Sequence, residues 1–105
     1  MAALGRKLRT LEGGRVAFWC PGCSQAHAVW VEDNAGRPMW FFDRDIAAPT
    51  FSPSIMVNRP GQYHNIRHPV CHSYVTKGRI LFLQDCTHAL AGQTVDLPDW
   101  PQGGA

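Results

Sequence analysis

Four cysteines in two separated pairs are the residues of this sequence whose spacing most strongly indicates chemistry. Cys20 and Cys23 form a Cys-Pro-Gly-Cys turn, and Cys71 and Cys86 lie far downstream. A Cys-x2-Cys turn directs two thiolates to one point, and a tetrahedral Zn²⁺ ion then needs two more ligands from elsewhere. We therefore predict a structural zinc site formed by Cys20, Cys23, Cys71 and Cys86, because four thiolates leave no open coordination position.

Disulfide bonds are the alternative use of these cysteines. The first residues lack the apolar core of a signal peptide, and no segment is long and apolar enough to span a membrane. We therefore expect a cytoplasmic protein without membrane contact, in a compartment where thiols stay reduced. This favours zinc over disulfides. His88 or His72 could replace one thiolate, and His27 is a minor ligand candidate or a group behind the ligands.

A histidine, an aspartate and two serines indicate a second kind of chemistry, which is hydrolysis. His72 and Asp85 are of the types that form the base and the orienting acid of a hydrolytic triad. Ser52 and Ser54 stand on either side of a proline and are candidate nucleophiles. His88 follows Asp85 closely and is a competing base. From spacing alone, a structural hydrogen bond is the more common role of such a His–Asp pair, and serines beside proline usually satisfy turns.

The segment of small residues at 89–94 offers a further possibility. Its backbone N–H groups could stabilise an oxyanion, although such a turn more often only permits tight packing.

A β-hairpin with its turn at residues 77–78 must position both candidate sites. Side chains alternate between the two faces along each strand. The alternation directs Cys71 and Cys86 to one face and His72 and Asp85 to the opposite face. This register pairs Thr76 with Arg79, Val75 with Ile80, Ser73 with Phe82 and Cys71 with Gln84.

Short strands separated by Gly and Pro turns are expected along the whole chain. The predicted strands are Lys7–Glu12, Arg15–Trp19, His27–Val31, Met39–Phe42, Thr50–Val57, Ser73–Thr76, Arg79–Gln84 and Gln93–Leu97. A loop is expected at 58–69, and the chain from Pro98 is expected to be loosely ordered. We predict a single domain over residues 1–105, all-β with little helix, as a small antiparallel sheet or partial barrel. A zinc ion would stabilise its modest core.

The overall charge argues against a nucleic-acid partner. The 105 residues carry a formal net charge of +2 with His neutral, and the basic residues form no long run.

Several motifs resemble a family of small bacterial and prophage proteins that long carried the label "domain of unknown function", sometimes with an "ammonia monooxygenase" name. The motifs are Phe18-Trp19-Cys20-Pro21-Gly22-Cys23, Pro49-Thr50-Phe51-Ser52-Pro53-Ser54-Ile55, Cys71-His72-Ser73 and the stretch from Asp85 to Thr94. Some relatives resemble serine-type peptidases of bacterial ubiquitin-like conjugation systems. Those relatives trim a ubiquitin-like protein or remove it from its targets.

The resemblance implies a zinc-stabilised serine-type peptidase whose substrate is a ubiquitin-like protein. It places the catalytic groups in the Ser-Pro-Ser segment, at His72 and in the stretch that begins at Asp85, without choosing between the two serines. We take Ser54 as the nucleophile, His72 as the base and Asp85 as the residue that orients it. His88 is then a reserve base or a ligand. Some members of the family carry Ser at the position of Cys86, which would make His88 the natural fourth zinc ligand.

Two other functions fit the same residues. The first is a non-catalytic, zinc-ribbon-like adaptor or phage accessory protein that binds another protein. The second is metal-dependent hydrolysis, in which His72 and His88 would bind a zinc ion that keeps a water molecule in an open position.

Overall fold

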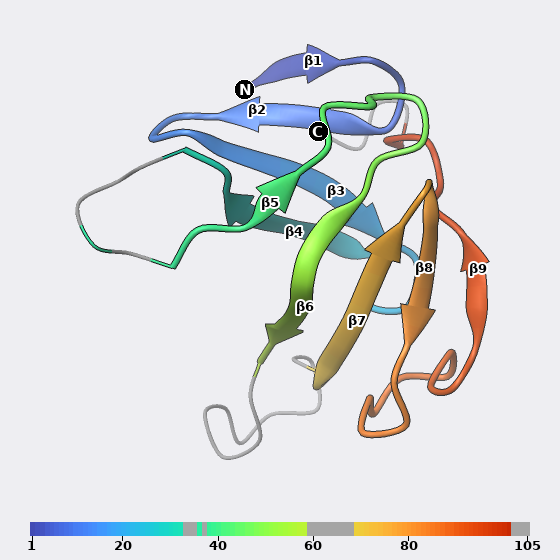
Figure 1. Ribbon diagram of the computed structural model, residues 1–105. Coiled ribbons are helices and arrows are strands. Elements are labelled where there is room, and N and C mark those ends of the chain that lie inside the picture. Colours follow the sequence, from blue (N-terminus) through green and yellow to red (C-terminus); the bar gives the residue numbers. More distant parts are fainter. Residues whose placement is uncertain (33–35, 37, 59–68, 102–105) are drawn as a thin grey trace.

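Two antiparallel β-sheets make up the computed structural model, which describes residues 1–32, 36, 38–58 and 69–101 (Figure 1). The described residues contain no helix, so the predicted all-β class is confirmed. Accordingly, that part of the chain also offers no helix with the length and apolarity needed to cross a membrane.

The N-terminal sheet is a meander with the strand order β1-β2-β3-β4. Its strands are β1 (Ala2–Leu4), β2 (Leu8–Leu11), β3 (Arg15–Cys20) and β4 (Gln25–Trp30). The β2–β3 turn contains Gly13 and Gly14 at φ 82° and 78°, a backbone conformation that glycine adopts without steric cost. The Cys-Pro-Gly-Cys turn joins β3 to β4 and is closed by a 2.9 Å hydrogen bond from the Ser24 N–H to the Cys20 carbonyl.

The C-terminal sheet has the strand order β5-β6-β7-β8-β9. Its strands are β5 (Phe41–Phe42), β6 (Phe51–Val57), β7 (Cys71–Thr76), β8 (Arg79–Phe82) and β9 (Thr94–Asp96). All eight predicted strands therefore overlap an observed one, whereas β1 was not predicted. The expected loop at 58–69 lies mostly outside the described residues.

The hairpin of β7 and β8 has the register that the sequence predicts. Ser73 pairs with Phe82 and Val75 with Ile80, and all four side chains are buried. Lys77 and Gly78 both have positive φ, as a two-residue type I′ turn requires. Strand β8 ends at Phe82 instead of Gln84, because a turn closed by the Cys86 N–H and the Leu83 carbonyl bends the chain away.

The buried side chains of the two sheets form one core. Phe18 of the N-terminal sheet stacks on Phe51 of the C-terminal sheet at 5.9 Å between ring centroids, and Phe42 stacks on Phe51 at 5.0 Å. The core extends to three cysteines, Cys20, Cys71 and Cys86, which places the sulfur atoms between the sheets.

Trp100 lies in the segment after Pro98 and contacts the N-terminal sheet. Trp100 is only 6% exposed, and its N–H donates a 2.8 Å hydrogen bond to the Arg6 carbonyl. Its indole packs edge-on against Trp19 and under the guanidinium of Arg9. An aromatic side chain with two such partners gains enough from burial to order its segment.

Candidate active site and metal centre

Ser54, His72 and Asp85 form a continuous hydrogen-bonded chain. The Ser54 Oγ lies 3.0 Å from Nε2 of His72, and Nδ1 of His72 lies 3.0 Å from Oδ2 of Asp85. A carboxylate only accepts, so Nδ1 carries the proton and Nε2 is left to accept from the serine hydroxyl. The arrangement is that of a nucleophile, a general base and an orienting acid.

Strand β6 positions the serine through an irregularity in its pairing with β7. The ladder is regular from Ile55 to Val57 but shifts register between Phe51 and Ile55. Such a bulge turns a side chain toward a new direction. Ser54 lies in this bulge and directly precedes Ile55, whose side chain is buried. The hydroxyl of Ser54 therefore faces His72 on the outer face of the sheet.

Backbone contacts around the turn after β8 position the imidazole and the carboxylate. The Leu83 N–H and the Cys86 thiol both donate to the His72 carbonyl, at 2.9 and 3.2 Å. Thr87 is fastened to Val70 by two hydrogen bonds, one from each backbone N–H. These contacts hold Asp85 beside β7, although its side chain is 49% exposed.

The remaining serine candidates do not reach the imidazole. Ser52 is exposed and pairs with Phe41 of β5, and Ser73 is fully buried on the inner face of β7. The N–H groups of residues 90–93 are also occupied. They donate to Nδ1 and the carbonyl of His88 and to the carbonyls of Phe82 and Leu90. That turn therefore packs instead of offering these donors to an oxyanion.

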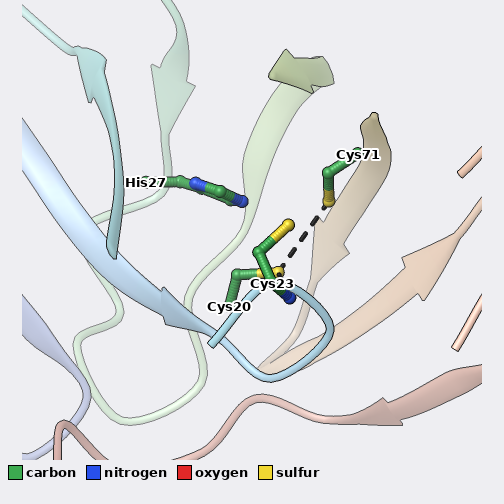
Figure 2. A group of neighbouring side chains, drawn as sticks. All are labelled: Cys20, Cys23, His27 and Cys71. Atoms are coloured by element: carbon green, nitrogen blue, oxygen red, sulfur yellow. Dashed lines mark hydrogen bonds between the residues drawn. The ribbon is translucent and has the colours of Figure 1, made fainter. Parts of the chain in front are cut away.

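A second cluster lies between the sheets, where four possible metal ligands converge (Figure 2). Cys20 comes from the end of β3, Cys23 from the turn, His27 from β4 and Cys71 from the start of β7, and their ligand atoms lie within 4.8 Å of one another. The Sγ atoms of Cys20 and Cys71 are 3.8 Å apart. Two thiolates on one tetrahedral zinc are also about 3.8 Å apart, given Zn–S bonds of ~2.3 Å.

The short distances between these thiols shift their pKa values strongly, in opposite directions. Hydrogen bonds from Cys23 and Cys71 lower the pKa of Cys20 far below its ordinary value. The hydrogen bond to Cys20 raises the pKa of Cys23 to about 12 and raises that of Cys71 as well. In the absence of a cation, therefore, one sulfur carries the negative charge and its two neighbours keep their protons.

The hydrogen bonds of His27 and His88 assign different tautomers to the two rings. Nδ1 of His27 lies 3.1 Å from the Ala26 carbonyl and must carry the proton, which leaves a lone pair on Nε2. Nδ1 of His88 accepts from the Leu90 N–H at 3.2 Å, so its proton sits on Nε2. Both Nε2 atoms are buried and lack a hydrogen-bond partner among the described residues. Of these two rings, His27 is therefore the one that presents a free lone pair to a metal.

Cys86 lies in a different group from the one that the sequence predicted. Its sulfur is near Cys71 and His88, within 4.8 Å, but is not among the four converging ligand atoms. Instead it both donates to the carbonyl of His72 and accepts from the N–H of His72, each at 3.2 Å. His72 belongs to neither group of possible ligands among the described residues. This arrangement gives no support to metal-dependent hydrolysis through His72.

The fold and the site define the class of protein: a small all-β domain that carries the hydroxyl–imidazole–carboxylate arrangement of a serine hydrolase beside a cysteine-rich cluster. The family model of the serine protease of bacterial ubiquitination-like systems, BubE, matches residues 5–83. The match covers well over half of the 105 residues, and the chain belongs to this family. It includes Ser54 and His72, whereas Asp85 lies just beyond it. Comparisons with curated proteins and with solved structures gave no match.

Proposed function

We propose that this protein is a zinc-stabilised serine-type peptidase that processes or removes a ubiquitin-like protein. The observation that carries the proposal is the chain of two 3.0 Å contacts from Ser54 through His72 to Asp85. The family name supports a protease and a ubiquitination-like system. The identity of the substrate and the roles of the three residues are our inference.

In the first half of the reaction, Ser54 Oγ attacks the carbonyl carbon of the scissile bond as its proton passes to Nε2 of His72. Asp85 accepts from Nδ1 and stabilises the imidazolium that forms. The tetrahedral intermediate collapses, the C–N bond breaks, and His72 returns the proton to the leaving amine. The acyl group is then held as an ester on Ser54.

In the second half, water attacks the ester carbon and gives its proton to Nε2 of His72. The imidazolium next protonates Ser54 Oγ as the C–O bond breaks. The products are a carboxylate and the original triad, so no proton is gained or lost by the protein.

Zinc fits the cluster of Cys20, Cys23, His27 and Cys71. The donor set of three thiolates and one imidazole is common in structural zinc sites, which need four protein ligands. His27 supplies a buried lone pair that has no other partner among the described residues. The bound ion would cross-link the sheets and take no part in bond breaking. His27 thus replaces Cys86 in the ligand set that the sequence suggested.

A fluorophosphonate probe tests the proposed nucleophile. The probe should label Ser54, and Ser54→Ala should abolish labelling because no other hydroxyl of the described residues contacts Nε2 of His72. His72→Ala should slow labelling by about 10²–10⁴-fold, the range for loss of a general base. Peptide mass spectrometry locates the label, and circular dichroism checks that each variant is folded.

The matched control is Ser52→Ala, which removes the exposed serine on the other side of Pro53. It should label at the wild-type rate. Labelling of Ser52, or full labelling of the Ser54 variant, would contradict the assignment. A folded, zinc-loaded wild-type protein that resists the probe altogether would favour the adaptor.

A further inference from the structure

In the described part of the chain, one edge of strand β6 is unpaired from the proposed nucleophile onward. Strand β5 pairs with β6 only at Ser52 and Phe51, so it covers only the first part of the strand (Figure 1). On the other side, β7 pairs with β6 as far as Val57. Among the described residues, no strand pairs with the β5 side of β6 beyond Ser52.

The backbone of Met56 points toward this free edge. In an antiparallel ladder, the N–H and C=O of one residue point to the same side, and hydrogen-bonded pairs alternate with unbonded ones. Met56 pairs with His72, whose N–H and C=O are directed to Cys86 and Leu83 on the opposite side of β7. The Met56–His72 pair is therefore unbonded, and the N–H and C=O of Met56 face away from β7.

Trp40 limits the edge at the nucleophile. Its indole N–H donates a 3.3 Å hydrogen bond to the carbonyl of Ser54. Trp40 directly precedes β5, the strand that pairs with β6 on the side away from β7, so the indole lies on the same side as the edge. An extended chain that pairs with Met56 meets this indole two residues later. The bound chain must then leave the edge at Ser54. The hydroxyl of Ser54 and the imidazole of His72 lie there, on the outer face of the sheet.

We propose that this edge binds the substrate: an extended peptide segment adds to β6 as an antiparallel strand and delivers its scissile carbonyl to Ser54. The inference rests on the proposed function and adds the binding site to it. Main-chain pairing of this kind gives affinity that depends little on the side chains of the bound segment. The occupant is therefore an unfolded tail, such as the C-terminal end of a ubiquitin-like protein, and not a folded surface.

Antiparallel pairing assigns each substrate residue a place. The residue that carries the scissile carbonyl is counted as the first and lies opposite Ser54. Counting toward the substrate's N-terminus, the second residue lies opposite Ile55 and the third lies opposite Met56. That third residue exchanges two hydrogen bonds with Met56, one from each N–H. The backbone N–H of the second residue points away from the protein. Loss of an N–H should therefore matter at the third residue and not at the second.

Alanine peptides that end in a phosphonate test this without knowledge of the natural sequence. The probe is acetyl-Ala-Ala-Ala diphenyl phosphonate, in which the phosphonate of the third alanine replaces the scissile carbonyl and reacts with Ser54. N-methylation of the first alanine removes the N–H that should bond to the Met56 carbonyl, and should slow labelling about tenfold. The matched control carries the same methyl group on the second alanine, and should label as fast as the unmodified probe.

Two variants test the protein side of the same contact. Met56→Pro removes the edge N–H without removing a donor from the ladder with β7, and Met56→Ala removes the side chain but keeps the N–H. The proline variant should react with the unmodified phosphonate about tenfold more slowly than the alanine variant. Thermal melting verifies that both variants are folded.

The outcomes separate the two proposals. If the small fluorophosphonate labels Ser54 but all three phosphonates react equally fast, the edge does not bind substrate and the peptidase assignment stands. Slowing by the methyl group on the second alanine instead of the first also overturns the edge model. If the fluorophosphonate does not label Ser54, the proposed function itself fails.

Discussion

At the scale of single residues, the hydrogen bonds of three histidines decide which ring nitrogen of each carries the proton and which can accept one or bind a metal. Nδ1 donates in His72 and His27, to Asp85 and to the Ala26 carbonyl, which leaves Nε2 as an acceptor in both. Nε2 of His72 faces the Ser54 hydroxyl on the outer face of the sheet. Nε2 of His27 is buried near the cysteine sulfur atoms. In His88 the proton sits on Nε2, which suits donation to a thiolate better than metal binding.

Asp85 provides the first prediction at this scale. Asp85→Asn replaces an acceptor by an amide that can donate to Nδ1, which favours the wrong tautomer of His72. We expect the rate at which the fluorophosphonate labels Ser54 to fall by up to about 10⁴-fold, while the fold persists because the carboxylate is half exposed. Stopped-flow measurement of fluorophosphonate labelling quantifies the loss.

The control for that variant is Asp96→Asn, which removes an exposed carboxylate that pairs with Arg79 on the same sheet. It should react like the wild type. An Asp85 variant of undiminished rate would show that the carboxylate does not orient the base.

At the scale of the elements, strand alternation decides which side chains meet. In β4 the inner positions are His27 and Val29, which are 4% and 2% exposed. In β7, Cys71 faces inward and His72 outward, so adjacent residues serve the two sites on opposite faces of one strand. The turn after β8 then places Cys86 against the backbone of His72. The cysteine thus links the two sites without joining the group of four ligands.

This placement predicts different effects for His27 and Cys86. His27→Ala should reduce the zinc content well below about one ion per chain, because it removes the fourth ligand. Cys86→Ser should retain zinc, since Ser also bonds to the backbone of His72. Mass spectrometry of the metal content in both variants makes the measurement.

A zinc-free Cys86 variant beside a fully loaded His27 variant would reverse the assignment and restore the four-cysteine site. Cys23→Ser is the reference, because its ligand atom belongs to the group of four. It should lose zinc in either case.

At the scale of the whole molecule, the cysteine cluster joins the two sheets. Cys20 and Cys23 come from the end of β3 and the turn after it, and Cys71 comes from β7. Among the described residues, the two sheets otherwise share a core of about a dozen buried apolar side chains, which is modest for a domain of this size. A metal bound at this position would therefore contribute a large part of the stability.

Removal of zinc should destabilise the fold. If the ion is present at about 1,000 times its dissociation constant, chelation lowers the free energy of unfolding by roughly 4 kcal/mol. For a chain of this size, that loss lowers the melting temperature by roughly 15–30 °C. Differential scanning calorimetry with and without chelator, followed by zinc addition, measures the change and its reversal. An unchanged melting temperature in metal-free protein would exclude a structural zinc.

Acid should also weaken zinc binding. Cys23, whose pKa is raised to about 12, and Cys71, whose pKa is also raised, keep their protons in the metal-free chain at neutral pH. Zinc must displace both protons, so the affinity for zinc should fall as the pH is lowered.

Local patterns in the sequence determined much of this protein. The alternation in β7 and β8, the two-residue turn between them and the Cys-x2-Cys turn predicted the register and the faces of Cys71 and His72. These features depend on residues a few positions apart, so the steric rules of turns and strands suffice to read them.

Only the tertiary structure decided which distant groups meet. We take Ser54 as the nucleophile from the sequence, but its contact with His72 depends on the bulge in β6, whose register no local pattern reveals. His27 belongs to the group of four possible ligands and Cys86 does not, because side chains of β3, β4 and β7 share one core. Contacts between two sheets depend on the simultaneous packing of many side chains from distant segments. A local sequence pattern describes only one strand or turn.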